Sequence, residues 1–338
     1  RSFQVTVNVA ARLEAHTKDA AGSQLSWNYS GFNNPYFAAL ENTNKDDRTH
    51  WIGGGSATYA FSNTLRATVR GGTDHSKATR DFEIDSTWMG GFPYYAGRGD
   101  FSKGGFQHQS VAASETNGDA FVTGSPAVSG GQLTITGGAG HRTNSFDLAT
   151  TASDLGARSA TGPSTSAHVT ADANTNSLYG TAVLAIADYA SISASARNEW
   201  YSVLASGNNS ALYPALFGSI DLARAGGVRN GPLSAAVVHA GWGRSGGEIS
   251  PLLLRSIFTG TQTTQPKVEA SPNLGPEATN SFELGTHLGF FNSRLGVDLT
   301  YYSERTSDVV VGLTGTAGSI VATNAATISN SGFEAQLT

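Results

Sequence analysis

The clearest pattern in the chain is a pair of segments, 281–290 and 294–304, that place an apolar side chain at nearly every second position. Leu284 and Leu288 lie on one side of the first segment, while Glu283 and His287 lie on the other. A strand of a soluble β-sandwich alternates in the same way. Segments of about ten residues with charges along one side favour strands that cross an outer membrane.

Similar alternation recurs along the chain, most regularly in residues 2–14. It predicts an all-β protein whose antiparallel strands form a transmembrane β-barrel wall. The pattern yields about twelve strands, at residues 2–14, 50–61, 64–74, 111–123, 131–142, 174–186, 190–200, 212–223, 233–243, 281–290, 294–304 and 331–338.

The segments between these strands alternate between short and long. Short turns such as Ser62–Asn63 alternate with long polar loops at 17–49, at 75–110 and before residue 174. Bacterial outer-membrane barrels have this asymmetry, with short periplasmic turns and long extracellular loops. Soluble domains seldom contain so many long irregular loops.

Several short motifs are characteristic of one family. Ser271–Glu277 reads S-P-N-L-G-P-E, and S-F-E-L-G, F-N-S-R-L and D-L-T-Y-Y follow it. With these motifs the chain resembles the TonB-dependent outer-membrane receptors, most closely their SusC/RagA-like branch. The other segments that carry the resemblance are Asn34–Tyr36, Arg197–Trp200, Tyr213–Pro214, Ala240–Gly243 and Asn330–Glu334.

The resemblance implies a barrel of 22 strands behind an N-terminal plug. Residues 1–338 would then form one partial barrel domain with about 12 of those strands, without the plug and the C-terminal strands. A complete twelve-stranded porin is the structural alternative, but the motifs belong to the middle and later parts of a much longer protein.

The composition restricts the remaining classes of protein. The chain has 41 glycines, 14% charged residues and no cysteine, and the absence of cysteine is compatible with an envelope compartment. A net charge of −5 gives no basic surface for nucleic acid. No apolar run reaches the roughly 18–20 residues of a membrane helix.

No catalytic or metal-binding constellation is recognisable. The eight histidines include no pair at zinc-ligand spacing. The glycine runs at 53–55 and 137–140 lack the Lys-Ser/Thr and the helix of a phosphate-binding loop. No G-x-S-x-G elbow is present, so the sequence predicts neither an enzyme nor a cofactor.

Two groups of residues are candidates for contact with a solute. Aromatic residues of the long loops can stack on sugar rings or apolar side chains, although they can equally form an interfacial girdle or pack the loops. Charged strand residues are expected to face the lumen and a plug or solute. The loop candidates are Trp27, Tyr29, Tyr36, Phe37, Trp88, Phe92, Tyr94 and Tyr95, and the lumen-facing candidates are Arg66, Arg70, Glu283, His287, Asp298 and Glu304.

The resemblance implies import of a large nutrient, an oligosaccharide or a peptide, across the bacterial outer membrane. Its implied partners are membrane lipid, a SusD-like surface lipoprotein acting as a lid, and the TonB complex acting through the missing plug. A siderophore or cobalamin receptor of the same architecture and a non-transporting adhesion or structural barrel remain alternatives.

Overall fold

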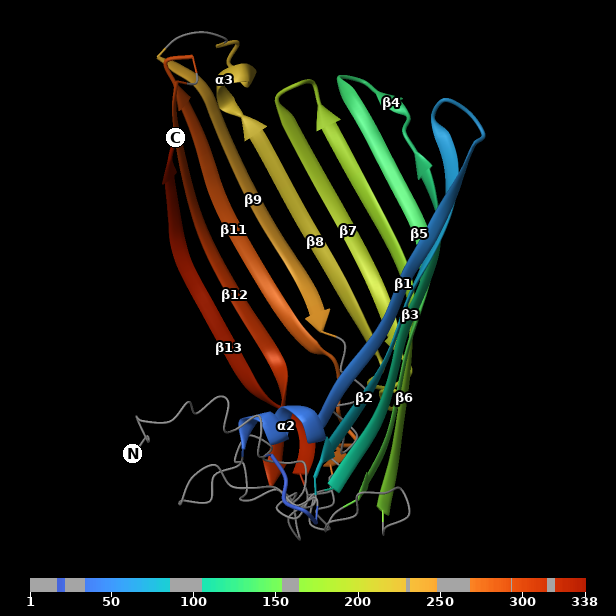
Figure 1. The fold of residues 1–338 in the computed structure, drawn as a ribbon. Helices are drawn as coiled ribbons and strands as arrows, with labels where there is room; N and C mark the ends of the chain where they lie inside the picture. The colour runs from blue at the N-terminus through green and yellow to red at the C-terminus, as the bar shows by residue number, and fades with distance from the viewer. Residues whose placement is uncertain are drawn as a thin grey trace, which may run out of the picture.

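The computed structural model describes residues 17–21, 34–85, 105–153, 164–228, 232–247, 268–292, 294–314 and 320–338. In these residues 13 strands form one sheet, in the order β1-β2-β3-β5-β6-β7-β8-β9-β11-β12-β13-β10 with β4 beside β5 (Figure 1). The long strands are β1 (Thr43–Ala60), β2 (Leu65–Ile84), β3 (Gly105–Gly124), β5 (Gly131–Ser153), β6 (Ser164–Ile186), β7 (Ala190–Tyr201), β8 (Ser210–Asp221), β9 (Leu233–Gly247), β11 (Glu277–Phe290), β12 (Leu295–Thr314) and β13 (Ile320–Leu337). The short elements are β4 (Ala127–Val128), β10 (Val268–Ala270), α2 (Pro35–Glu41) and α3 (Leu222–Ala225).

All neighbouring long strands pair antiparallel, as predicted. Only the three-residue β10 pairs in parallel, with β13, among the described strands. The short connections β1–β2, β6–β7 and β11–β12 lie at one end of the curved sheet, at the top of Figure 1. By the convention of outer-membrane barrels this is the periplasmic end.

The two faces of the sheet differ in chemistry. Leu216, Trp242 and Phe282 are partners in neighbouring strands and are 54%, 44% and 41% exposed. The same face carries Val69 and Leu178, which are also exposed. Exposed apolar side chains spread over one side of a sheet are typical of the lipid-facing surface of a barrel. We call it the outer face and the opposite side the inner face.

The strands extend beyond the predicted ones at the end opposite the short turns. The predicted loops 17–49 and 75–110 are partly wrong, because β1 begins at Thr43, β2 runs to Ile84 and β3 begins at Gly105. Most of the predicted loop before residue 174 is likewise strand, in β5 and β6. The added residues are largely polar, and cross-strand pairs such as Arg80–Asp46 at 2.7 Å stabilise them.

Eleven of the predicted strands fall in described strands, while the predicted strand 2–14 lies outside the described residues. Among the described helices none is long and apolar enough to cross a membrane.

The S-P-N-L-G-P-E motif fixes the start of β11, as its proline content indicates. Leu274 is buried against Tyr201 and Leu204. The Asn324 side chain accepts from the Gly275 N–H at 2.7 Å and donates to the Gly275 carbonyl at 2.9 Å. The motif therefore connects the beginning of β11 to β7 and β13.

Candidate functional site: the inner face of the wall

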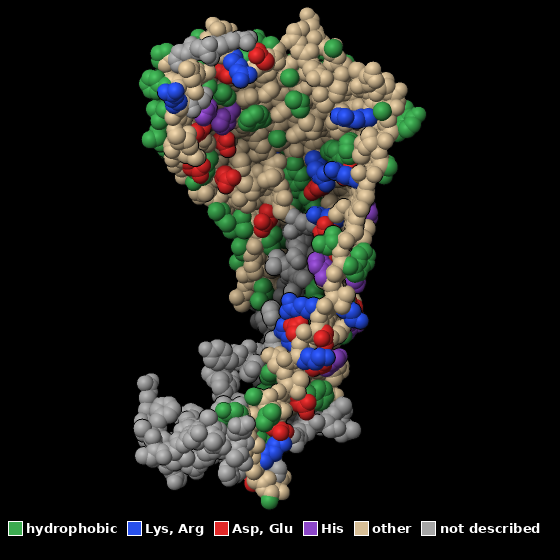
Figure 2. Space-filling model, turned by 45° about the horizontal axis from the view of Figure 1, so that its top comes forward, with side chains coloured by type: hydrophobic (Ala, Val, Ile, Leu, Met, Phe, Trp, Pro, Cys, Tyr) green, Lys and Arg blue, Asp and Glu red, His purple; other side chains and the backbone are tan. Residues whose placement is uncertain are grey.

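The strand register places all six lumen-facing candidates on the inner face. Arg66 and Arg70 come from β2, and the others come from β11 and β12. Whether they contact a plug or a solute stays a prediction. The inner face is mixed in charge, and Figure 2 shows acidic, basic and histidine side chains close together.

The first part of the inner face is a chain of polar contacts from β2 to β7. The Arg70 Nε donates to both carboxylate oxygens of Asp119, at 3.0 and 2.9 Å. The Tyr179 hydroxyl donates to the same carboxylate at 3.4 Å. The Arg197 guanidinium lies 5.5 Å from the Tyr179 ring centroid, which is cation–π geometry.

The second part continues the chain across β7 and β8. Arg197 Nε donates to Glu199 at 2.7 Å, and the Tyr201 hydroxyl donates to the other Glu199 oxygen at 2.5 Å. The Tyr213 hydroxyl lies 2.8 Å from that of Tyr201. Since Tyr201 gives its proton to Glu199, Tyr213 is the donor in this pair. We call the residues Arg70, Asp119, Tyr179, Arg197, Glu199, Tyr201 and Tyr213 the inner polar ladder.

Glycines provide the space for the tyrosine rings of the inner polar ladder. A Cβ at Gly138 would lie 2.8 Å from Tyr179 Cζ, and a Cβ at Gly246 would lie 2.0 Å from the Tyr213 hydroxyl. Both side chains therefore occupy the space above a glycine of a neighbouring strand, and aromatic side chains placed over strand glycines stabilise sheets. The ladder is held against the wall.

A second group of contacts pairs histidines with carboxylates on β9, β11 and β12. His239 Nε2 lies 3.1 Å from Glu283, and His287 Nδ1 lies 2.7 Å from Asp298. Gly285 leaves room for the His239 ring, which a Cβ there would approach to 2.4 Å. Glu283, His287 and Asp298 are among the lumen-facing candidates predicted from the sequence.

A third group lies on the extension of β1 and β2, beyond the apolar part of the strands. Arg48 donates two hydrogen bonds to Asp46, of 2.7 and 2.9 Å, and Arg80 donates two more, of 2.7 and 3.3 Å. The hydrogen bonds from Arg48 and Arg80 hold the pKa of the Asp46 carboxyl well below its usual value. Asp46 is therefore ionised at neutral pH and orients two cations.

Of the aromatic loop candidates, the structure places Tyr36 and Phe37, both in α2. Asn34 accepts from the Tyr36 N–H at 2.9 Å and begins this helix. Tyr36 is half-buried, whereas Phe37 has no exposed surface, so its ring packs inside rather than facing a solute. Trp27, Tyr29, Trp88, Phe92, Tyr94 and Tyr95 lie outside the described residues.

The chemistry of the inner face is that of binding through guanidinium, carboxylate and phenol groups. Among the described residues, no group of three or more His, Cys, Asp or Glu side chains is placed to hold a metal ion. The fixed Arg groups can donate to polar groups of a bound molecule, the Glu group can accept from them, and the Tyr hydroxyls can do both.

The comparisons with known proteins agree with this architecture. Residues 6–338 match the family described as TonB dependent receptor-like, beta-barrel. The chain belongs to this family. A curated TonB-dependent receptor of Formosa agariphila is 25% identical over 129 residues, which are 35% of this chain and 13% of that protein. The family consists of receptors and transporters rather than enzymes.

Solved structures of TonB-dependent receptors share the fold. The RagAB peptide transporter matches with a TM-score of 0.76 and 18% identity over 95% of this chain and 38% of that one. The pyoverdine receptor FpvA of P. aeruginosa matches with a TM-score of 0.56 and 13% identity over 95% of this chain and 41% of that one. The chain therefore spans less than half the length of these proteins.

Of the inner polar ladder only Arg70 was predicted as a lumen-facing candidate, whereas Asp119, Tyr179, Arg197, Glu199, Tyr201 and Tyr213 were missed as site residues. A signal was present for Tyr201, because it follows Arg197 and Glu199 at two-residue steps and so shares their face. Asp119 and Tyr179 join Arg70 only through the register of three hairpins.

Proposed function

We propose that this TonB-dependent receptor imports a large nutrient, an oligosaccharide or a peptide, across the bacterial outer membrane in the manner of SusC-like transporters. The observation that carries the proposal is the inner polar ladder on a wall of this family. Its fixed Arg, Glu and Tyr groups suit solutes rich in hydroxyl or amide groups, because each can pair with a donor or an acceptor of such a solute.

The fold similarity supports the SusC-like branch. RagAB, described as a peptide importer, matches with TM-scores of 0.73 to 0.76. The siderophore receptors Fiu of E. coli and PiuA of Acinetobacter baumannii match at 0.54 and 0.55. A siderophore receptor is therefore the second candidate for the same wall.

The proposal includes the partners that such an importer needs. A SusD-like surface lipoprotein would cover the extracellular end, and the TonB complex would act through a plug. The aromatic loop candidates, Tyr36 among them, would contact the solute together with the inner polar ladder. Arg66 and Glu304 would face the same path.

Uptake by the source bacterium tests this proposal. Cells with and without the receptor gene are given labelled oligopeptides or labelled oligosaccharides, in the presence and absence of a functional TonB complex. Import is expected for one solute class, and its loss is expected in both mutants. Uptake that does not depend on the receptor would refute import, and loss of surface attachment with unchanged uptake would favour an adhesion barrel.

Neighbouring residues of β2 provide a matched pair of variants. Arg70→Ala removes an inner-face guanidinium that is exposed, so folding should survive because exposed ion pairs contribute little stability. Val69→Ala shortens an exposed side chain of the outer face. Uptake should fall in Arg70→Ala and stay normal in Val69→Ala. Equal uptake by both variants would count against the inner polar ladder as the solute path.

A further inference from the structure

The outer face changes from apolar to polar along the strands β1 to β6. On β2 the outer-face positions read Leu65, Ala67 and Val69 and then Thr73 and His75. His75 belongs to a row of five register partners on neighbouring strands. The row consists of Trp51, His75, Ser114, Ser145 and Asp172, and we call it the outer polar row.

The outer polar row lies where the lipid core of the membrane ends. Ten residues separate Leu65 from His75 on β2, which is roughly 33 Å along a strand at about 3.3 Å per residue. A strand tilt of about 40° reduces this to about 25 Å of height, the usual thickness of the apolar band of such barrels. Trp51, which is 50% exposed, then occupies the position of an interfacial aromatic residue.

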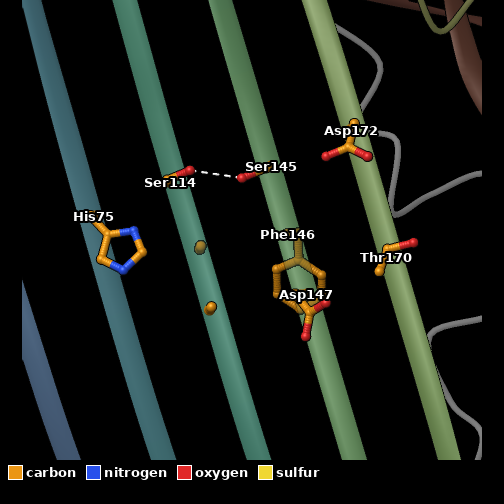
Figure 3. A pocket seen from close by; sticks show the side chains of 9 residues that line it. His75, Ser114, Ser145, Phe146, Asp147, Thr170 and Asp172 are labelled. Atoms are coloured by element: carbon orange, nitrogen blue, oxygen red, sulfur yellow. Dashed lines mark hydrogen bonds between the residues drawn. The ribbon is translucent and has the colours of Figure 1, made fainter.

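A shallow pocket of about 320 Å³ lies along this row, within the size range of small-ligand sites. Figure 3 shows His75, Ser114, Ser145 and Asp172 at one level of four strands, with Asp147 and Thr170 in the next row. The Ser114 and Ser145 hydroxyls are 2.7 Å apart. Outside this row, His168 Nε2 lies 2.8 Å from Asp147, which orients that carboxylate.

We propose that this pocket binds the sugar headgroup of a glycolipid of the outer leaflet. Sugar hydroxyls can donate to the carboxylates of Asp147 and Asp172 and accept from the hydroxyls of the paired serines. An aromatic platform stands beside the pocket, because the Trp51 ring centroid lies 5.7 Å from that of His75. Tryptophan rings are common at the membrane interface because one end of the side chain is apolar and the other can remain in water.

The lipid, and not a free sugar, is the expected source because the pocket is continuous with the apolar outer face. The acyl chains of a glycolipid would lie against residues such as Val69 and Val122, which are 60% and 47% exposed, while its first sugars reach the outer polar row. Two carboxylates in the pocket disfavour a phosphate there by like-charge repulsion. This site is on the opposite face from the proposed transport path and does not depend on it.

The test uses the full-length receptor, reconstituted in phosphatidylethanolamine vesicles that contain or lack a lipo-oligosaccharide. Glycolipid that remains bound after detergent extraction is counted by native mass spectrometry. The site variant is Asp147→Ala combined with Asp172→Ala. The matched control is Asp81→Ala, since Asp81 is also an outer-face carboxylate paired with a histidine, His108, but lies outside the pocket.

The wild type and Asp81→Ala should retain the lipo-oligosaccharide. The double variant should retain about tenfold less of it than the wild type, as expected for the loss of two hydrogen-bonding groups. Heat-dependent gel mobility confirms that each variant is folded. Equal retention by all three proteins would overturn the proposal. Equally tight binding of the delipidated oligosaccharide, or occupation of the pocket by a second copy in cross-linking, would overturn the assignment to a glycolipid.

Discussion

Replacing Gly138 by alanine tests the close fit between the inner polar ladder and the wall. Gly138 lies on β5 between its register partners Phe121 and Tyr179. An added Cβ would lie 2.6 Å from Phe121 Cβ, 2.7 Å from the Ala120 carbonyl oxygen and 2.8 Å from Tyr179 Cζ. Tyr179 can rotate away by giving up its bond to Asp119, but the two contacts with β3 remain.

The expected cost is about 1–3 kcal/mol in the free energy of unfolding, the usual range for overpacking. The neighbouring Gly137 is the control, because a Cβ there meets nothing within 4 Å. Alanine restricts the unfolded chain equally at both positions, so the difference between Gly138→Ala and Gly137→Ala isolates the packing cost.

The measurement is urea-induced unfolding of the full-length receptor in detergent micelles, followed by tryptophan fluorescence and heat-dependent gel mobility. Gly138→Ala should unfold at lower urea than Gly137→Ala, which should unfold at the same urea concentration as the wild type or slightly above it. Equal midpoints for the two variants would refute the reasoning that Gly138 is required for the approach of Tyr179 to the wall.

Two other predictions concern contacts at the extracellular side. The Val310 N–H donates to Glu277 at 2.7 Å beside a bulge in β12. Glu277→Ala removes this partner and should lower the free energy of unfolding by about 1–3 kcal/mol. Urea unfolding measures the change, and an unchanged midpoint would contradict the prediction. The pKa of Asp46 is lower in the folded protein than in the unfolded chain, where it is about 3.9. The pairs of Asp46 with Arg48 and Arg80 therefore stabilise the folded state fully above about pH 3.9, and this stabilisation is lost as the pH falls through the folded pKa. Hydrogen-exchange protection of β1 should fall on acidification in the wild type and stay constant in Asp46→Asn. Equal pH profiles for the two proteins would count against a stabilising role of the Asp46 pairs.

The sequence predicted those parts of the fold that lie in lipid, because there the two faces of a strand must differ. The apolar Leu65 and the charged Arg66, for example, are enough to distinguish the outer face of β2 from its inner face. The extensions were missed because Thr43–His50 is polar on both faces and reads as a loop. Its strand structure comes from cross-strand pairs such as His50–Asp74 at 2.8 Å, and alternation does not record such pairs.

The same reason limits prediction of the inner face. Alternation gave the side on which Arg70 and Glu283 lie, but partners depend on register. His287 lies beside Asp298 because the β11–β12 turn fixes that register, whereas Arg70 meets Asp119 across 49 positions of sequence. Loop candidates such as Phe37 were chosen by residue type alone, and burial is set by packing that residue type does not specify.

The order of strands also bears on how such a wall enters a membrane. Within the described sheet, β1 has a neighbour on one side only, and β13 is covered on its second side only by the three residues of β10. Each backbone N–H and C=O left without a partner in lipid costs several kcal/mol. Wherever the wall lies in lipid, these two edges therefore need further strands as partners, so a barrel of this kind has to pair its edges as it inserts rather than afterwards.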